Sequence, residues 1–189
     1  HNQKSLIGLR QYNGDQKTFY ANLLFQTKSE DDIHSVTVGG SFALDKYDES
    51  FDGINFSRNE SRPGLFAEYT FSPINTLTIV PGARVDFHNL YGTFFTPRLH
   101  VKYNIDENTT LRASAGKGYR SVNLFAENLN YLASSRYFVI IDNPSYEEAW
   151  NYGLNLTRYI PINDRELRVT AEYYRTDFIK QTVVDIDAA

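Results

Sequence analysis

Three histidines within the chain, His34, His88 and His100, are the first candidates for metal binding or acid–base chemistry. They form no pair at positions i and i+4, and no glutamate stands beside them in the pattern of a zinc enzyme. The alternation described below puts His34 near a turn on an apolar face. It puts His88 and His100 on the polar face of adjoining strands, where structural hydrogen bonds are the simpler role. No Ser-His-Asp grouping or acid–base pair stands out, so we predict no catalytic residue and no enzyme activity.

A glycine-lysine-glycine run at 116–118 is a candidate phosphate loop. The phosphate-loop motif needs a glycine five residues before that run's first glycine and a serine or threonine directly after the lysine. Leu111 and Gly118 occupy those two positions, and no helical pattern follows. We therefore expect no nucleotide site here, and the sequence indicates no cofactor.

An acidic run before Gly53 is a candidate calcium site, because Ca²⁺ prefers several carboxylate oxygens. The spacing of these carboxylates is not that of a helix-loop-helix calcium site. A solvated acidic loop is the simpler interpretation, so we predict no metal site. Calcium binding by this loop stays open as an alternative. The acidic residues are Asp45, Asp48, Glu49 and Asp52.

Most of the segments around these candidate residues show the two-residue period of half-exposed β-strands. In the segment 17–27, for example, Phe19, Leu23 and Phe25 share one face, whereas Thr18 and Asn22 lie on the other. The same alternation runs through 33–44, 64–72, 76–88, 97–105, 110–116 and 149–160, and more loosely through 167–179, while 5–12 reads as the tail of one further strand. The pattern predicts an all-β protein built as an antiparallel up-and-down meander of eight or nine strands.

The connections between these strands alternate in length. Short polar turns are expected at 28–32, 72–75, 106–109 and 161–165, and longer segments at 45–62, 89–95 and 119–143. If the connection 89–95 is centred on Gly92, Asp86 should lie opposite Arg98 and Arg84 opposite His100. Short turns at one end and long loops at the other, with aromatic residues near strand ends, are typical of an outer-membrane barrel.

Composition excludes several classes of protein. The net charge of −4, with 19 lysines and arginines scattered along the chain, argues against a nucleic-acid partner. The longest apolar run, Tyr137 to Ile141, is far shorter than the ~20 residues of a membrane-spanning helix. A spanning β-strand needs only about 9 to 11 residues and shows every second one to lipid. The chain has 14 tyrosines and 13 phenylalanines but neither cysteine nor methionine, and we expect it to be a fragment of a longer protein.

The stretch GKGYRSVNLFAEN, from Gly116 to Asn128, resembles the mid-barrel signature of TonB-dependent outer-membrane receptors. The likeness is strongest to receptors of the Bacteroidetes type. PGLFAEYT from Pro63, YEEAWNYGLNL from Tyr146 and AEYYRTDFIKQTVVD from Ala171 agree with it in order and spacing, so that the resemblance covers nearly the whole chain.

The resemblance implies that residues 1–189 are part of a transmembrane barrel of about 22 strands, from which the plug domain is absent. It implies a location in the bacterial outer membrane, contact with its lipid, and coupling to TonB through the missing plug region. The imported ligand would be a scarce small molecule: a siderophore, a corrinoid, a metal chelate or a glycan. The best candidates for ligand contact are Tyr119, Arg120, Arg136 and Tyr137 in the segment 119–143, followed by the segment 45–62.

One alternative comes from a different class of protein. A soluble β-sandwich that serves in adhesion or carbohydrate binding at the cell surface also has alternating strands, with one face of each sheet in a core. The two architectures differ in what covers the apolar face. A barrel fragment leaves that face and two strand edges open, so we expect the isolated fragment to self-associate through its edges.

Overall fold

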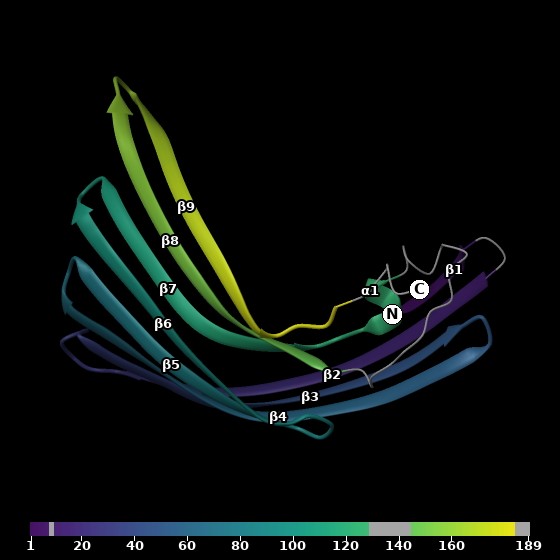
Figure 1. The fold of residues 1–189 in the computed structure, drawn as a ribbon. Coiled ribbons are helices and arrows are strands. Elements are labelled where there is room, and N and C mark those ends of the chain that lie inside the picture. The colour runs from purple at the N-terminus through teal and green to yellow at the C-terminus, as the bar shows by residue number, and fades with distance from the viewer. Residues whose placement is uncertain (8–9, 129–144, 184–189) are drawn as a thin grey trace.

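The computed structural model describes residues 1–7, 10–128 and 145–183. Nine strands in this part of the chain form one antiparallel sheet, in which spatial order follows sequence order. They are β1 (Asn2–Ile7), β2 (Arg10–Lys28), β3 (His34–Phe51), β4 (Ile54–Ile74), β5 (Leu77–His88), β6 (Gly92–Asp106), β7 (Thr109–Ser121), β8 (Tyr146–Ile162) and β9 (Arg165–Lys180). Figure 1 shows the sheet bent into an open trough, with the short helix α1 (Leu124–Glu127) on its concave side. The predicted meander is confirmed.

One face of the sheet is apolar and uncovered. Cross-strand register aligns Leu23, Gly40, Leu65, Val85 and Phe95 in a continuous row across β2 to β6. Leu23 is 79% exposed and Leu65 is 64% exposed. We call this the convex face. The described residues form no second sheet against it, so the expectation of two packed sheets in a sandwich is wrong.

The opposite, concave face buries charge instead of an apolar core. Most of the buried side chains are polar or charged, and Glu60 has no exposed surface at all. Charged groups are rarely buried unless they are paired, so this face must hold a network of ion pairs and hydrogen bonds. The residues that build it include Asp45, Glu60, Asp86 and His88.

The segment 45–62 is not the loop that the sequence predicted. β3 continues to Phe51 and β4 begins at Ile54, joined by a tight turn at Asp52 and Gly53, both of which have positive φ. β2, β3 and β4 therefore have 19, 18 and 21 residues, well beyond the ~9–11 that cross a bilayer. We call this part, residues 12–18 of β2, 45–51 of β3 and 54–62 of β4, the outer extension. Its convex face is polar, whereas its concave face mixes charged residues with aromatic ones such as Tyr47 and Phe51, so the apolar–polar alternation is lost although the backbone ladder continues.

The predicted connection 89–95 is also shorter than expected. β5 ends at His88 and β6 begins at Gly92, and these two residues are paired. The hairpin is thus centred before Gly92, which places Asp86 opposite Phe94 and Arg84 opposite Thr96. The predicted pairs of Asp86 with Arg98 and of Arg84 with His100 are wrong.

The four expected short turns are all present, and they lie together at the end of the sheet opposite to the outer extension. The expected strand tail at 5–12 is instead split between β1 and β2. In the described part of the chain, no helix has the length and apolar character needed to cross a membrane.

Candidate functional site

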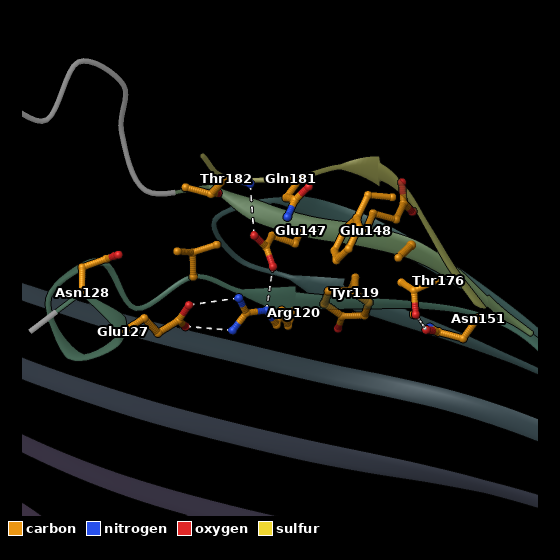
Figure 2. Close-up of a pocket in the computed structure, with 14 residues that line it drawn as sticks. Tyr119, Arg120, Glu127, Asn128, Glu147, Glu148, Asn151, Thr176, Gln181 and Thr182 are labelled. Atoms are coloured by element: carbon orange, nitrogen blue, oxygen red, sulfur yellow. Dashed lines mark hydrogen bonds and ion pairs between the residues drawn. The ribbon is translucent and has the colours of Figure 1, made fainter. Parts of the chain in front are cut away.

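A pocket of about 510 Å³ lies at the paired ends of β7 and β8, near Arg120 and Glu147. Its walls come from the end of β7, from α1, from the start of β8, and from β9 with the residues that follow it. Figure 2 shows Arg120 in its floor, with Glu127 and Glu147 on either side. The pocket opens at the same end of the sheet as the outer extension, away from the four short turns.

Arg120 is held by two carboxylates. Its Nη1 and Nη2 donate to the two oxygens of Glu127 at 2.9 and 3.0 Å, and its Nε donates to Glu147 Oε2 at 2.7 Å. The two-point contact with Glu127 is the strong, planar form of arginine–carboxylate pairing. Hydrogen bonds from Glu127 and then Glu147 raise the pKa of Arg120 above its usual value. The predicted ligand-contacting arginine is thus oriented by acidic neighbours.

The same carboxylates also fix the backbone around the pocket. The amide N–H of Asn123 donates to Glu127 Oε1 at 3.0 Å, which satisfies a donor at the start of α1. The amide N–H of Thr182, just beyond β9, donates to Glu147 Oε1 at 3.0 Å. A continuous series of polar contacts beside the pocket therefore joins β7, α1, β8 and the chain after β9.

Tyr119 belongs to an aromatic cluster beside the pocket. Its ring stacks on Phe94 with centroids 3.8 Å apart, and Phe94 meets the ring of Tyr146 edge-on at 4.7 Å. Tyr91 lies 5.8 Å from Tyr146, and the ammonium of Lys180 lies 4.1 Å above the same ring. Of these residues the sequence analysis named only Tyr119 as a candidate for ligand contact. The signal for Tyr91 and Tyr146 was available, because each is an aromatic residue three positions from the end of a predicted strand.

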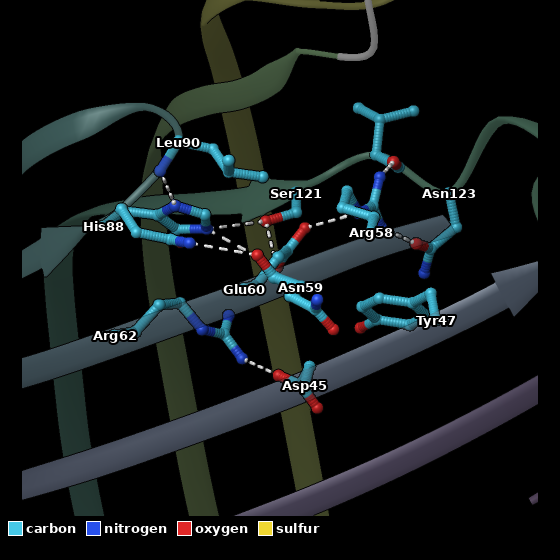
Figure 3. A network of polar contacts seen from close by, with 12 residues as sticks. Asp45, Tyr47, Arg58, Asn59, Glu60, Arg62, His88, Leu90, Ser121 and Asn123 are labelled. Atoms are coloured by element: carbon cyan, nitrogen blue, oxygen red, sulfur yellow. Dashed lines mark hydrogen bonds and ion pairs between the residues drawn. The ribbon is translucent and has the colours of Figure 1, made fainter. Parts of the chain in front are cut away.

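A buried polar network lies next to this cluster, on the concave face. Glu60 faces Arg58 Nε at 2.8 Å, accepts a hydrogen bond from Ser121 Oγ at 2.9 Å, and lies 3.4 Å from His88 Nε2. The backbone N–H of Leu90 donates to the other ring nitrogen of His88 at 3.1 Å. Figure 3 shows these groups converging from β4, β5 and β7. His88 thus has the structural hydrogen bonds that the sequence analysis preferred over a metal role.

The remaining candidate residues divide into two groups. Arg136 and Tyr137 lie in 129–144, outside the described residues. The acidic residues of the predicted loop lie on the outer extension, where Asp45 pairs with Arg62 and Glu49 accepts a hydrogen bond from Tyr12. Within residues 1–7, 10–128 and 145–183, no group of three or more histidine or acidic side chains is arranged to hold a metal ion.

The family of the chain follows from comparison with known proteins. The model of the TonB dependent receptor-like β-barrel family matches residues 1–188. The chain belongs to this family. A sheet with one apolar face and one charged face is what a strand segment of an outer-membrane barrel requires.

Curated relatives include two iron receptors. The chain is 33% identical over 72 residues to the ferric enterobactin receptor of Pseudomonas aeruginosa, and 28% identical over 72 residues to the ferrienterobactin receptor of Escherichia coli K12. Each match covers 38% of this chain and 10% of the relative. The chain thus matches a small part of these receptors. The likeness to receptors of the Bacteroidetes type stays a prediction.

Solved structures with the same fold include siderophore receptors. The receptor PirA from Pseudomonas aeruginosa aligns with a TM-score of 0.71 at 16% identity, over 98% of this chain and 39% of PirA. A variant of the ferric enterobactin receptor PfeA from the same organism aligns with a TM-score of 0.67 at 18% identity, over 89% of this chain and 27% of PfeA. At these identities the likeness concerns the fold, and it assigns the nine strands to part of a receptor barrel.

Proposed function

We propose that this chain is a wall segment of a receptor that imports a ferric siderophore across the bacterial outer membrane, with energy coupled through TonB. Family membership supports the transport class, and the two curated relatives support the iron-chelate ligand. TonB would act through a plug domain that is no part of these residues. The family is one of receptors, so we propose no enzymatic activity for the chain.

The single observation that carries the ligand proposal is that Arg120 and Tyr119, one ring of the aromatic cluster, line the same pocket at the outer end of the barrel. Tyr119 precedes Arg120 in β7, and Tyr146 is paired with Ser121 at the start of β8. An arginine beside aromatic rings suits an anionic ligand that carries aromatic groups, because the guanidinium binds oxygen anions while the rings stack. A ferric catecholate has both properties.

Energetics allow such a ligand to compete for Arg120. The contact between Arg120 and Glu127 is half exposed, with 55% and 32% of the two side chains accessible. Exposed ion pairs contribute about 0–1 kcal/mol, and the two-point geometry places this pair at the upper end of that range, so a ligand oxygen that pairs equally well with Arg120 can replace Glu127 at little net cost. Glu147, at 9% exposure, is the anchor that keeps Arg120 in place during this exchange.

We also propose two kinds of contact for the wall itself. The convex face meets lipid, since its large apolar side chains are exposed in the single sheet. β1 and β9 are the edges of that sheet, and unpaired strand edges are templates for pairing with another chain. In the receptor they would pair with further barrel strands, and in the isolated fragment with other copies of itself.

The test uses the full-length receptor that contains this chain, expressed in an iron-starved strain that lacks its own siderophore receptors. We expect growth on ferric enterobactin, and an Arg120→Gln variant that binds it roughly 10-fold more weakly by fluorescence titration. Arg165→Gln, at the turn between β8 and β9 and so at the opposite end, is the matched control and should bind normally. Failure of the receptor to bind or import any ferric siderophore would overturn the proposal.

A further inference from the structure

We propose that Arg58, on the outer extension of β4, is a positioning residue for the ligand pocket at the ends of β7 and β8. It acts through a continuous set of contacts, which we call the polar relay. The relay consists of Arg58, Asn123, Glu127, Arg120 and Glu147. This inference rests on the proposed function, because it assigns the pocket as the ligand site.

The first link of the relay crosses two intervening strands. Arg58 lies on β4, and its Nη1 donates to the backbone carbonyl of Val122 at 2.9 Å, 64 residues further along the chain. Its Nη2 donates to the side-chain carbonyl of Asn123. β4 and β7 are separated in the sheet by β5 and β6, so these bonds reach across the concave face. They fix the point at which the chain leaves β7.

The second link runs from Asn123 into the pocket. The backbone N–H of Asn123 donates to Glu127 Oε1 at 3.0 Å, and that same oxygen accepts from Arg120 Nη1 at 2.9 Å. Moving Asn123 therefore moves the carboxylate that orients Arg120. Val122, which is also held by Arg58, is buried and lines the pocket directly.

The surroundings of Arg58 make it a rigid starting point. Its side chain is 5% exposed, its Nε faces Glu60 at 2.8 Å, and its guanidinium lies 4.6 Å above the ring of Tyr47. Ser121 Oγ donates to the same Glu60 at 2.9 Å, which ties β7 to β4 a second time. A buried ion pair gives little net stability over apolar packing. The presence of the Arg58–Glu60 pair therefore fits a role in holding a defined geometry.

The variant Arg58→Lys distinguishes a positioning role of Arg58 from a role in folding. Lysine keeps the charge next to Glu60, but it lacks the planar fork that reaches Val122 and Asn123 together. Arg62→Lys is the matched control, because Arg62 lies on the same strand and face but pairs with Asp45 inside the β3–β4 hairpin. Asn123→Ala removes the side-chain oxygen that Arg58 contacts, and it leaves the backbone N–H of residue 123 and the Arg58–Glu60 pair in place.

The experiment first measures hydrogen exchange in the ligand-free, full-length receptor in detergent. We expect the peptide covering 121–128 to exchange at least about 10-fold faster in Arg58→Lys and in Asn123→Ala, and normally in Arg62→Lys. Unchanged exchange at 121–128 in both relay variants would overturn the proposal. This arm needs no ligand, so it stands even if the proposed function fails.

The second arm measures affinity for ferric enterobactin as the probe. We expect Arg58→Lys to weaken binding roughly 5- to 20-fold, and to do so less than about 2-fold when Glu127→Ala is already present. A merely structural role for Arg58 would give the same loss in both backgrounds and would overturn the relay. A wild-type receptor that does not bind the probe would instead contradict the proposed ligand, and the exchange arm alone then decides the inference.

Discussion

The hydroxyl of Tyr12 donates to Glu49 Oε1 at 2.8 Å, and both side chains are buried in the outer extension. This contact joins β2 to β3 beyond the part of the barrel that crosses the membrane. Burial of the hydroxyl, followed by its hydrogen bond to Glu49, raises the pKa of Tyr12 above its ordinary value. The phenol is therefore neutral in the folded state over a wider pH range than in the unfolded chain.

The raised pKa of Tyr12 predicts a specific loss of stability at high pH. The unfolded chain loses the phenolic proton near pH 10 while the folded protein keeps it, so stability falls as pH rises above about 10. Below that pH, Tyr12→Phe should lower stability by about 1–3 kcal/mol, because Glu49 loses a buried partner. Melting temperatures of the full-length receptor between pH 8 and 11 provide the measurement. We expect the difference in melting temperature between wild type and Tyr12→Phe to decrease above pH 10. A difference that stays constant up to pH 11 would contradict the raised pKa of Tyr12.

The convex face predicts a position-specific response to charge. Leu23 lies near the middle of the apolar rows, on the face that we propose to meet lipid, so Leu23→Arg should cost about 2–4 kcal/mol. Asn22→Arg is the matched control, since the neighbouring residue of β2 points to the interior. We expect the receptor to fold into lipid vesicles with Asn22→Arg and to fold poorly with Leu23→Arg. Equal behaviour of the two variants would exclude this face as the lipid-facing wall.

Removal of one partner from the buried network should be strongly destabilising. Arg58→Ala leaves the carboxylate of Glu60 buried without its cation, at a cost of about 3–5 kcal/mol. The double variant Arg58→Met with Glu60→Leu should recover most of that loss, because it removes both charges together. Thermal unfolding of the full-length receptor measures both. If the double variant is as unstable as Arg58→Ala, then packing rather than an unpaired charge accounts for the loss.

The stack between Tyr119 and Phe94 predicts a different pattern for two substitutions at one position. Tyr119→Phe keeps the ring, whereas Tyr119→Leu removes a stacked pair that contributes about 0.5–1.5 kcal/mol beyond its buried area. We expect ferric enterobactin to bind normally to Tyr119→Phe and more weakly to Tyr119→Leu in fluorescence titrations. Weakened binding in Tyr119→Phe would show instead that the hydroxyl, not the ring, contacts the ligand.

Part of the candidate site could be identified from the sequence. The run from Gly116 to Asn128 pointed to Tyr119 and Arg120, and the structure places both at the pocket or its aromatic wall. The acidic partners of Arg120 were not identified. Glu127 and Glu147 are 7 and 27 residues away from it, and only the return of the chain through β8 brings Glu147 alongside.

The sheet, the order of its strands and its short turns could be predicted from the sequence alone. Alternation of apolar and polar residues is a local signal, and it is strong wherever one face meets lipid and the other meets the barrel interior. Short polar segments such as 72–75 and 106–109 then mark where the strands end. The family resemblance rested on the motif from Gly116 to Asn128 and three further segments, and the match over residues 1–188 confirmed it.

The outer extension could be recognised only in three dimensions. In the segment 45–62 the convex face is polar and the concave face mixes charged with aromatic residues, so the apolar–polar alternation is lost although the strands continue to pair. The register of the hairpin at Gly92 likewise depends on which backbone groups pair, and a shift of one residue changes every cross-strand neighbour. The contact between Arg58 and Val122 depends on the curvature of the sheet, which brings β4 and β7 together across its concave face. No local pattern encodes that curvature, because it arises from the summed twist of all the strands between them.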